Sequence, residues 1–354
     1  MIWEMKRILR QVVGIDVAQK ELVVYFGLLN AELGIEMKAY KTFPNTLNGF
    51  AKLVVWAWKL KDADTTVRFV MEATGVYHES LAYFLDSESF DVSVVLPNKI
   101  ANYFKTLDVK TVTDKTAAET ICRFGLGREL DSWKRPHKVF KMMMQLCRER
   151  DQIVVERTVS KNQLHAEESE AQPHQPSIFR AKERINLFDR QEKEVQAELR
   201  VLIKNDESVD RLMTLLCSIP GVGTLTAATV LAETNGFELI KNKRQLTSYA
   251  GLDVKEKESG TSVKGQPRIS KRGNKYLRKA MHLPALTAIR HDERFKAIFT
   301  RLVARHGIKM KAAVAVQRKL LEMIYTIYST QQPYDKDYLK SKNELGKVES
   351  STKN

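Results

Sequence analysis

The sequence contains little cysteine and no long apolar run. Its three cysteines, Cys122, Cys147 and Cys217, lie far apart among 354 residues. This odd, scattered set matches neither a disulfide framework nor the paired spacing of a zinc site, so we expect a reducing compartment, the cytoplasm. No apolar run reaches the roughly 18 residues that a membrane span requires. The first ten residues also lack the apolar core and cleavage site of a secretion signal.

The composition is typical of a chain with several folded domains. Hydrophobic residues make up 43% of the sequence and charged residues 29%, which excludes a wholly disordered protein. At about 150 residues per domain, the length predicts two or three domains. We expect domains at residues 1–130, 131–210 and 211–332. Residues 333–354 are polar and charged and are predicted to form a poorly ordered tail.

The positive charge of the chain is concentrated in one segment. The chain has 58 Lys and Arg against 43 Asp and Glu, a net charge of +15. Residues 241–330 hold 21 basic and 6 acidic side chains, whereas the first 240 residues hold 32 and 33. A charge kept for solubility would be spread more evenly, while a concentrated one is typical of a polyanion site. We therefore favour a nucleic-acid partner over a solvated basic face.

The first third of the chain predicts a mixed α/β sheet. Three β-branched runs come first, and helices and strands then alternate. Asn45 is predicted to cap a helix that continues through Trp58, and a second helix is expected near Glu79–Leu85. This order places helices on the faces of the sheet and is compatible with a ribonuclease-H-like (RuvC-like) domain, although other α/β folds share it. The predicted strands are Gln11–Val17, Glu21–Gly27, Met37–Phe43, Val67–Met71 and Val92–Leu96.

The middle of the chain predicts two long helices. Apolar residues from Val139 to Ile153 and from Ile185 to Leu202 have coiled-coil spacing, with Glu192 in the one polar slot of the second run. Pro173 and Pro176 lie between the two runs and stop helix formation. The pattern fits an antiparallel hairpin, an oligomerisation arm or two helices packed within one domain. The residues that follow, 211–330, are predicted to be mainly helical.

Two carboxylates follow predicted strands of the first domain. Asp16 ends the first strand, and Glu72 follows the strand that begins at Val67. Carboxylates that converge at strand ends can hold Mg²⁺, which prefers oxygen ligands, and such metal sites can clamp a phosphodiester. The alternative is that each acid is simply exposed to solvent at its strand end.

Two motifs of the C-terminal part could bind phosphate groups. Gly221 and Gly223 lie in a tight turn after Pro220, where backbone amides and a helix N-terminus could bind the nucleic-acid backbone. A close corner between two helices explains the same residues equally well. Ser259 and Ser262 lie further along, in a glycine-containing loop beside lysine and arginine residues. A serine becomes a nucleophile only when its surroundings activate it, and most loop serines are not nucleophiles.

Taken together, these motifs resemble the IS110 family of insertion-sequence transposases, DEDD recombinases that a bridge RNA guides. The resemblance covers nearly the whole chain in order, and it includes the turn at residues 219–223. The combination of motifs at these spacings is specific, although each motif alone is moderate. The motifs are GIDVAQKEL (14–22), MEATGVYHESLA (71–82), VKTVTDKTAAETI (109–121) and SGTSVKGQPRISKRGN (259–274).

The resemblance implies an acidic site with four positions. Asp16, Glu72 and Asp114 match the first three, and Ala117 stands where the family has its fourth acid, an Asp. Positions i and i+3 share a helix face, so the two aspartates of the family project together, whereas Ala117 offers no oxygen. Glu119 points well around the helix and is a poor substitute. Two explanations stay open: a naturally weakened site, or a substitution that inactivates the enzyme.

The resemblance also implies a reaction and partners. Ser262 matches the nucleophilic serine, which would form a covalent phosphoserine link while Mg²⁺ or Mn²⁺ is held by Asp16, Glu72 and Asp114. A noncoding RNA, donor and target DNA and a homotetramer are implied, in the bacterial cytoplasm at the nucleoid. For the RNA we expect a local basic face on the first domain, formed by Lys99, Lys105, Lys110 and Lys115. The residues predicted to bind nucleic acid elsewhere are Gly221, Gly223, Lys264, Arg268, Lys271, Arg272 and Arg278.

Two other functions remain open. A junction-resolving, RuvC-like nuclease would use the acidic site alone, with water as the nucleophile. A nucleic-acid-binding protein without catalysis is the second alternative, and Ala117 favours it.

Overall fold

The computed structural model describes residues 7–62, 64–73, 75–107, 111, 113–238, 240–255, 258–259, 263–264 and 268–337. The chain divides into two compact units, residues 1–135 and 136–354. Each unit has its own hydrophobic core. Within the described ranges, no helix is long and apolar enough to cross a membrane.

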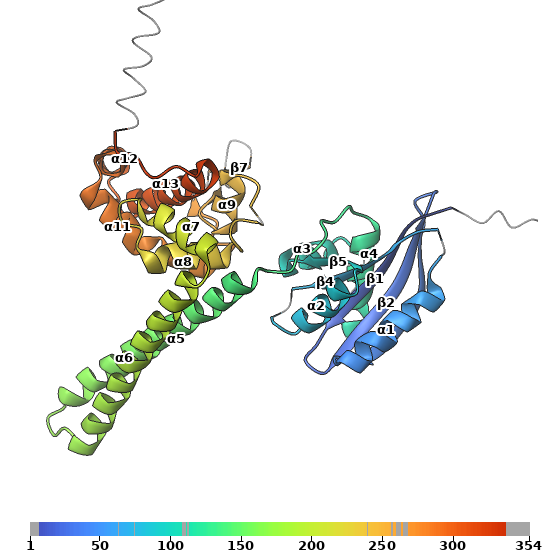
Figure 1. Cartoon of the computed structure of the whole chain (residues 1–354), viewed down its shortest axis with the longest axis horizontal. Coiled ribbons are helices and arrows are strands. Elements are labelled where there is room, and N and C mark those ends of the chain that lie inside the picture. Colours follow the sequence, from blue (N-terminus) through green and yellow to red (C-terminus); the bar gives the residue numbers. More distant parts are fainter. Residues whose placement is uncertain are drawn as a thin grey trace, which may run out of the picture. The chain divides into compact units, whose positions relative to one another are not determined.

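A five-stranded mixed sheet forms the centre of the first unit (Figure 1). Its strand order is β3-β2-β1-β4-β5. The first three strands form an antiparallel meander, and β4 and β5 then run parallel to β1. The strands are β1 (Ile8–Val17), β2 (Glu21–Asn30), β3 (Ile35–Pro44), β4 (Val67–Glu72) and β5 (Asp91–Val95).

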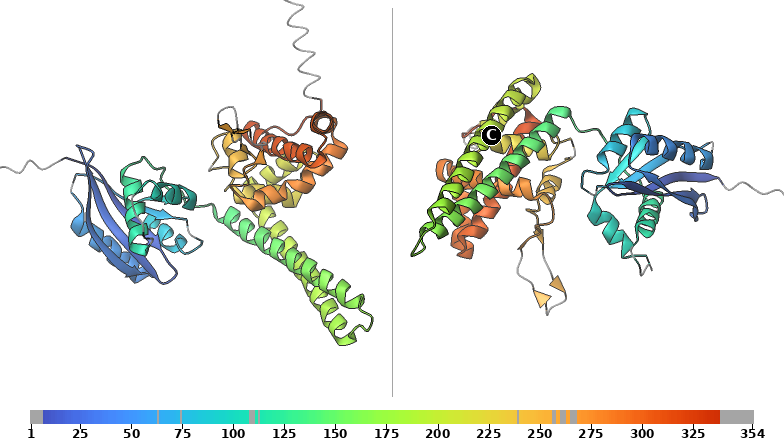
Figure 2. Two further views of the ribbon diagram at one scale, coloured as in Figure 1. Left: turned by 180° about the vertical axis from the view of Figure 1, so that it is seen from behind. Right: turned by 90° about the horizontal axis from the view of Figure 1, so that it is seen from below.

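Helices cover both faces of this sheet. Helices α1 (Leu47–Leu60) and α2 (Glu79–Ser87) contribute to the core on one face. Helices α3 (Pro97–Phe104) and α4 (Asp114–Leu126) contribute to the core on the other face. Figure 2 shows α4 on the side of the sheet away from α1. The predicted α/β domain with a ribonuclease-H-like arrangement is therefore confirmed.

One local prediction is wrong: Asn45 does not cap α1. The N-cap is Thr46, whose side chain accepts a hydrogen bond from the backbone N–H of Gly49. The side-chain amide of Asn45 donates instead to the carbonyl oxygens of Ala18 and Tyr77, at 2.9 and 3.3 Å. Both residues are good helix-capping types, and the long-range contacts of Asn45 decide between them.

A long helical hairpin begins the second unit. Helices α5 (Lys138–Glu168) and α6 (Gln175–Lys204) run side by side, and Pro176 lies in the first turn of α6 (Figure 1). Their buried seam contains apolar residues and also Glu192. Glu192 accepts hydrogen bonds from Arg150 and Arg157 across the seam, so the one polar slot is filled by ion pairs.

The remaining helices of the second unit pack around one core with the base of the hairpin. Short antiparallel ladders, β6 with β9 and β7 with β8, lie between α9 and α10. The predicted mainly helical C-terminal region is confirmed. The helices are α7 (Glu207–Cys217), α8 (Thr224–Glu233), α9 (Lys243–Tyr249), α10 (Lys275–Ala280), α11 (His282–His291), α12 (Glu293–His306) and α13 (Lys309–Thr330). The short strands are β6 (Val254–Lys255), β7 (Glu258–Ser259), β8 (Val263–Lys264) and β9 (Arg268–Ile269).

The first residues of the predicted tail have defined contacts. The backbone N–H of Tyr334 donates to the hydroxyl of Ser218 at 2.8 Å, and the Tyr334 hydroxyl donates to Asp292 at 2.8 Å. Burial and the neighbouring Asp292 carboxylate raise the pKa of Tyr334 to about 12. Tyr334 is thus held against the end of α7 and the start of α12, and residues 338–354 lie outside the described part of the chain.

Candidate functional site

The first candidate site lies at one edge of the sheet of the first unit. Asp16 and Glu72 follow Ile15 and Met71, which are paired in the parallel β1–β4 ladder, so both acids lie at the same edge. Side chains alternate along a strand, and Val12 on β1 and Val70 on β4 face the α4 side. Asp16 lies four residues after Val12, and Glu72 lies two residues after Val70. Both acids therefore point to the α4 side of the sheet.

Helix α4 brings a third acid to this edge. Asp114 is its first residue, and the N-cap Thr113 forms a reciprocal capping box with Thr116. A Cβ atom on Gly14 would lie 2.3 Å from the backbone nitrogen of Cys122. Only glycine therefore lets α4 approach β1 this closely, and the close approach fixes where the start of the helix lies over the sheet.

The carboxylates of Asp16 and Asp114 repel each other electrostatically. Asp16 is half-buried, and burial followed by the negative charge of Asp114 raises its pKa above the ordinary value. A hydrogen bond from the backbone of Val17 acts in the opposite direction. Both causes of the raised pKa disfavour the charged carboxylate, and a bound cation would remove this penalty.

Residue 117, the position predicted for a fourth acid, has no side-chain oxygen that could bind a metal ion. Ala117 is half-buried one turn into α4, next to Ala118, which is buried against the sheet. Glu119 forms an ion pair with Arg123 at 2.8 Å instead of facing the acidic pair. Among the described residues, no group of three or more His, Cys, Asp and Glu side chains is arranged to hold a metal ion. The carboxylates that are present therefore fit a divalent cation only in part.

The predicted basic face on the first unit is partly described. Lys99 on α3, Lys105 at its end and Lys115 on α4 are exposed to solvent. Lys110 lies outside the described residues.

The second candidate site is the basic segment of the second unit, residues 259–273, which lies within the positively charged region 241–330. Arg268, Lys271 and Arg272 are exposed, as the prediction of a polyanion contact requires. The side chain of Lys264 and the whole of Ser262 lie outside the described residues. The position of the predicted nucleophile therefore remains a prediction from the resemblance.

The base of this segment, its end next to α10, packs against the turn that follows α9. Gly273 passes so close that a Cβ atom on it would lie 2.3 Å from the carbonyl oxygen of Tyr249. Arg278 was predicted to bind nucleic acid, and its guanidinium donates to the carbonyl oxygen of Ala250 at 2.8 Å. Arg278 thus holds the base of the segment in place, whereas Lys271 and Arg272 lie at the surface.

The glycine turn between α7 and α8 contains two different environments. A Cβ atom on Gly221 would lie 2.4 Å from the carbonyl oxygen of Pro284, so Gly221 permits close packing against α11. Gly223 is the N-cap of α8, is exposed, and has open space where a Cβ atom would be. The close corner explains Gly221, and only Gly223 leaves its backbone accessible to a phosphate.

A buried carboxylate, which the sequence analysis missed, links these parts of the second unit. The side chain of Glu233 at the end of α8 is 1% exposed. It accepts two hydrogen bonds from Arg148 of α5, at 2.8 and 2.9 Å, and one from Asn274, at 2.6 Å. Asn274 caps α10, directly after the basic segment. Glu233 thus connects the hairpin to the base of that segment, and the available signal was an acid at the end of an apolar helix.

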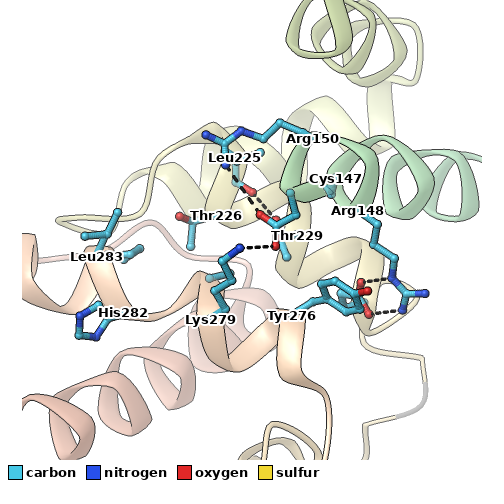
Figure 3. A pocket seen from close by; sticks show the side chains of 14 residues that line it. Cys147, Arg148, Arg150, Leu225, Thr226, Thr229, Tyr276, Lys279, His282 and Leu283 are labelled. Carbon is cyan, nitrogen blue, oxygen red and sulfur yellow. Dashed lines mark hydrogen bonds and ion pairs between the residues drawn. The ribbon is translucent and has the colours of Figure 1, made fainter. Parts of the chain in front are cut away.

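A cavity of about 410 Å³ lies beside this network, between α5, α8, α10 and α11. Figure 3 shows Arg148 next to the ring of Tyr276, and Lys279 in the same wall of the cavity. The Arg148 guanidinium lies 4.6 Å from the ring centre of Tyr276, and the Lys279–Asp151 ion pair measures 2.9 Å. These cations of the cavity wall are already paired within the protein.

Comparison with known proteins identifies the family. A DEDD transposase model of the IS110 type matches residues 13–167, and the model "Transposase IS116/IS110/IS902 family" matches residues 213–300. The chain belongs to the IS110 family of transposases. The DEDD match covers Asp16, Glu72 and Asp114, and the second match covers the glycine turn and the basic segment.

The chain is also similar to individual curated proteins and to one solved structure. The chain is 27% identical to the pilin gene-inverting protein of Moraxella bovis over 92% of this chain and 97% of that protein. It is 32% identical to the transposase for insertion sequence element IS1111A of Coxiella burnetii over 39% of this chain and 38% of that one. Among solved structures, RuvC of T. thermophilus in complex with a Holliday junction matches with a TM-score of 0.25 and 10% identity, over 33% of this chain and 97% of RuvC.

Proposed function

We propose that this IS110-family transposase cuts and rejoins DNA strands, with Ser262 as a nucleophile and a noncoding RNA as the guide to donor and target DNA. The observation that carries the proposal is the Asp16–Asp114 pair, which the close approach of α4 to β1 creates at the edge of the sheet. We further propose that four subunits form the active assembly in the bacterial cytoplasm. In this assembly, acids and serine from different subunits contribute to each active site.

In the proposed reaction, Ser262 Oγ attacks a DNA phosphorus atom. The new O–P bond replaces the bond to one deoxyribose oxygen, which leaves with the proton that the serine loses overall. One phosphoester is exchanged for another, so the link stores the energy needed to rejoin a strand. Exposed cations such as Lys271 and Arg272 would stabilise the charge on the phosphate.

Mapping of a trapped protein–DNA adduct by mass spectrometry tests the serine. We expect an adduct at Ser262 in an Ala117→Asp background. Ser262→Ala should abolish both adduct and strand exchange while it leaves DNA and RNA binding intact, and the matched control Ser259→Ala should retain exchange. An adduct at Ser259, Thr261 or a tyrosine would contradict the assignment.

The basic segment supports DNA binding through phosphate contacts. Such binding releases counterions, so the logarithm of affinity should fall with the logarithm of salt concentration, with a slope of about −0.9 for each contact. Lys271→Ala/Arg272→Ala should flatten this slope without changing sequence preference. A slope unchanged by the double substitution would place the DNA elsewhere.

The proposed guide RNA has its own test. Exposed lysines of the first unit, Lys99, Lys105 and Lys115, support a contact there. Crosslinking of bound RNA should therefore give products within residues 1–135 as well as in the basic segment. RNA crosslinks confined to residues after 241 would contradict a guide held by the first unit.

Two alternatives follow from particular observations. A junction-resolving nuclease would use the acidic edge alone, and cleavage without any protein–DNA adduct would favour it. Ala117 and the incomplete carboxylate group favour a nucleic-acid-binding protein without catalysis. Metal-dependent strand cleavage by Ala117→Asp, but not by Ala117→Asp/Asp16→Asn, would exclude that second alternative.

A further inference from the structure

A stacked aromatic pair lies on the same side of the sheet as the acidic edge. Tyr25 of β2 and Tyr40 of β3 are paired across the antiparallel ladder, and their rings stack at 5.5 Å with an interplanar angle of 27°. Tyr25 is buried beneath α4 with the core of that side, whereas Tyr40 is 54% exposed. The pair thus presents one anchored ring and one ring that is open to solvent.

A lysine lies over the open ring. The Nζ atom of Lys115 is 4.0 Å from the ring centre of Tyr40. Burial raises the pKa of Tyr25, and the positive charge of Lys115 acts against this rise. Lys115 directly follows Asp114, whose charge acts on Asp16. A cation, an aromatic face and the acidic pair therefore meet around the first turn of α4.

The register of the sheet fixes the distance to the acidic edge. Asp16 pairs with Val23 of β2, and Tyr25 lies two residues further along the same strand. Tyr25 pairs with Tyr40 of β3, which is one strand further from Asp16. At about 3.3 Å per residue along the strands and about 4.8 Å between them, the Cα atoms of Asp16 and Tyr40 are roughly 12 Å apart. An extended strand spans this distance in a small number of nucleotides, so a strand whose base lies on Tyr40 can place a nearby phosphate at Asp16 and Asp114.

We propose that Tyr40, supported by Tyr25 and Lys115, is a stacking platform for an unpaired base of the nucleic-acid strand that approaches the acidic edge. Aromatic side chains bind single-stranded DNA or RNA by stacking, because every base has a π face, and a nearby cation binds the adjoining phosphate. Lys115 would leave the ring of Tyr40 when the base arrives and hold that phosphate. This inference rests on the proposed function, since it supplies the binding of a strand to the acidic site.

A structural contact without a ligand is the competing explanation, and the chain provides a matched control. Trp58 of α1 is 41% exposed, its ring lies 5.0 Å from that of Phe90, and Lys61 Nζ lies 5.2 Å from its ring centre. This aromatic–lysine pair has similar chemistry and belongs to the same unit. It lies on the opposite side of the sheet, away from the acidic edge.

Photocrosslinking of the full-length chain tests the platform. Single-stranded DNA and RNA oligonucleotides that carry 5-iodouracil would be irradiated with the protein, and the crosslinked residue mapped by mass spectrometry. We expect a crosslink at Tyr40 that is lost when the oligonucleotide is annealed to its complement, and none at Trp58. The arm with the greater yield, DNA or RNA, identifies which strand uses the platform.

Affinity measurements separate stacking from folding. Tyr40→Ala should weaken single-strand binding by roughly 5- to 100-fold, the effect of losing one stacked base. Tyr40→Phe should restore binding because it keeps the ring, and Lys115→Ala should weaken binding less. The control Trp58→Ala should leave affinity unchanged. Equal losses in Tyr40→Ala and Trp58→Ala, or crosslinks that avoid β2 and β3, would overturn the proposal.

The outcomes remain distinguishable from those for the proposed function. A crosslink at Tyr40 without a Ser262 adduct keeps the platform and rejects the serine recombinase. A Ser262 adduct without any crosslink at Tyr40 keeps the recombinase and rejects the platform.

Discussion

Asp16 in the first unit and Glu192 in the second are both withdrawn from water, but their neighbours carry opposite charges. Asp16 lies near Asp114, and burial together with that negative charge raises its pKa. At Glu192, burial favours the neutral acid, but Arg150 and Arg157 outweigh it and lower the pKa. Glu233 is likewise paired with Arg148.

This difference separates the arginine-paired carboxylates of the second unit from the acidic pair of the candidate site. Glu192 and Glu233 hold helices together, because each is paired with arginine inside the second unit. The Asp16–Asp114 pair costs stability in the isolated protein, and such a cost is typical of a site prepared for a positively charged ligand. The first unit thus keeps two carboxylates that repel each other, whereas Glu192 and Glu233 of the second unit are each paired with arginine.

Removal of the arginine partner of Glu233 should have the largest effect. Arg148→Met leaves a carboxylate that is 1% exposed without its main cation, and should lower the free energy of unfolding by about 3 kcal/mol. The double variant Arg148→Met/Glu233→Gln should regain much of this loss. Urea unfolding followed by the helical circular dichroism signal measures both. Equal stability of Arg148→Met and the unmodified chain would show that Glu233 does not need its partner.

Disturbing the close approach of α4 to β1 should have the second largest effect on stability. Gly14→Ala would force the backbone of Cys122 away and should cost about 1–3 kcal/mol. All four tryptophans lie before residue 136, so tryptophan fluorescence follows the first unit alone. Gly127→Ala is the matched control, because its Cβ atom would lie 3.5 Å from the nearest atom. In Gly14→Ala the pKa of Asp16 should also move back towards its ordinary value, and an unchanged pKa would contradict the role given to α4.

Lowering the pH should change the contributions of Glu192 and Asp16 to stability in opposite directions. The folded-state pKa of Glu192 is lowered, so its contribution to stability is present above the unfolded pKa and is lost as the pH falls through the folded pKa. Glu192→Gln should lower stability at neutral pH by about 1–2 kcal/mol and make the acid loss shallower. An acid unfolding profile of the same slope in both chains would argue against these ion pairs.

Asp16→Asn should have the smallest effect, and the opposite sign. The folded-state pKa of Asp16 is raised, so its unfavourable contribution grows as the pH rises through that pKa and is absent below the unfolded value. The variant should be more stable than the unmodified chain at neutral pH, by about 1 kcal/mol or less because Asp16 is only half-buried. Tryptophan fluorescence during thermal unfolding measures the gain, and a loss of stability would contradict the strained pair.

The sequence predicted those elements whose signals are local. The β-branched runs of the first unit predicted its strands, and the heptad-like spacing around Glu192 predicted the hairpin. The pairing of Asp16 with Asp114 came from the resemblance, because nothing in either segment alone indicates that they meet.

What escaped prediction depends on contacts between distant residues. The fit of Gly14 against Cys122 and the ion pair between Arg148 and Glu233 join positions about 100 residues apart. The contact of Tyr334 with Asp292 likewise has no signal in the polar tail where it occurs. Pattern-based reasoning sees the type of each residue but not the partner that tertiary packing gives it.

Strand exchange by Ala117→Asp, compared with the unmodified chain, tests the central claim most directly. A carboxylate at position 117 would share the α4 face of Asp114 and complete the acidic group, so Mg²⁺ or Mn²⁺ should bind more tightly. The account predicts that Ala117→Asp has metal-dependent exchange well above that of the unmodified chain, and that Asp16→Asn in the same background abolishes it. Exchange no greater in Ala117→Asp than in the unmodified chain would contradict the account.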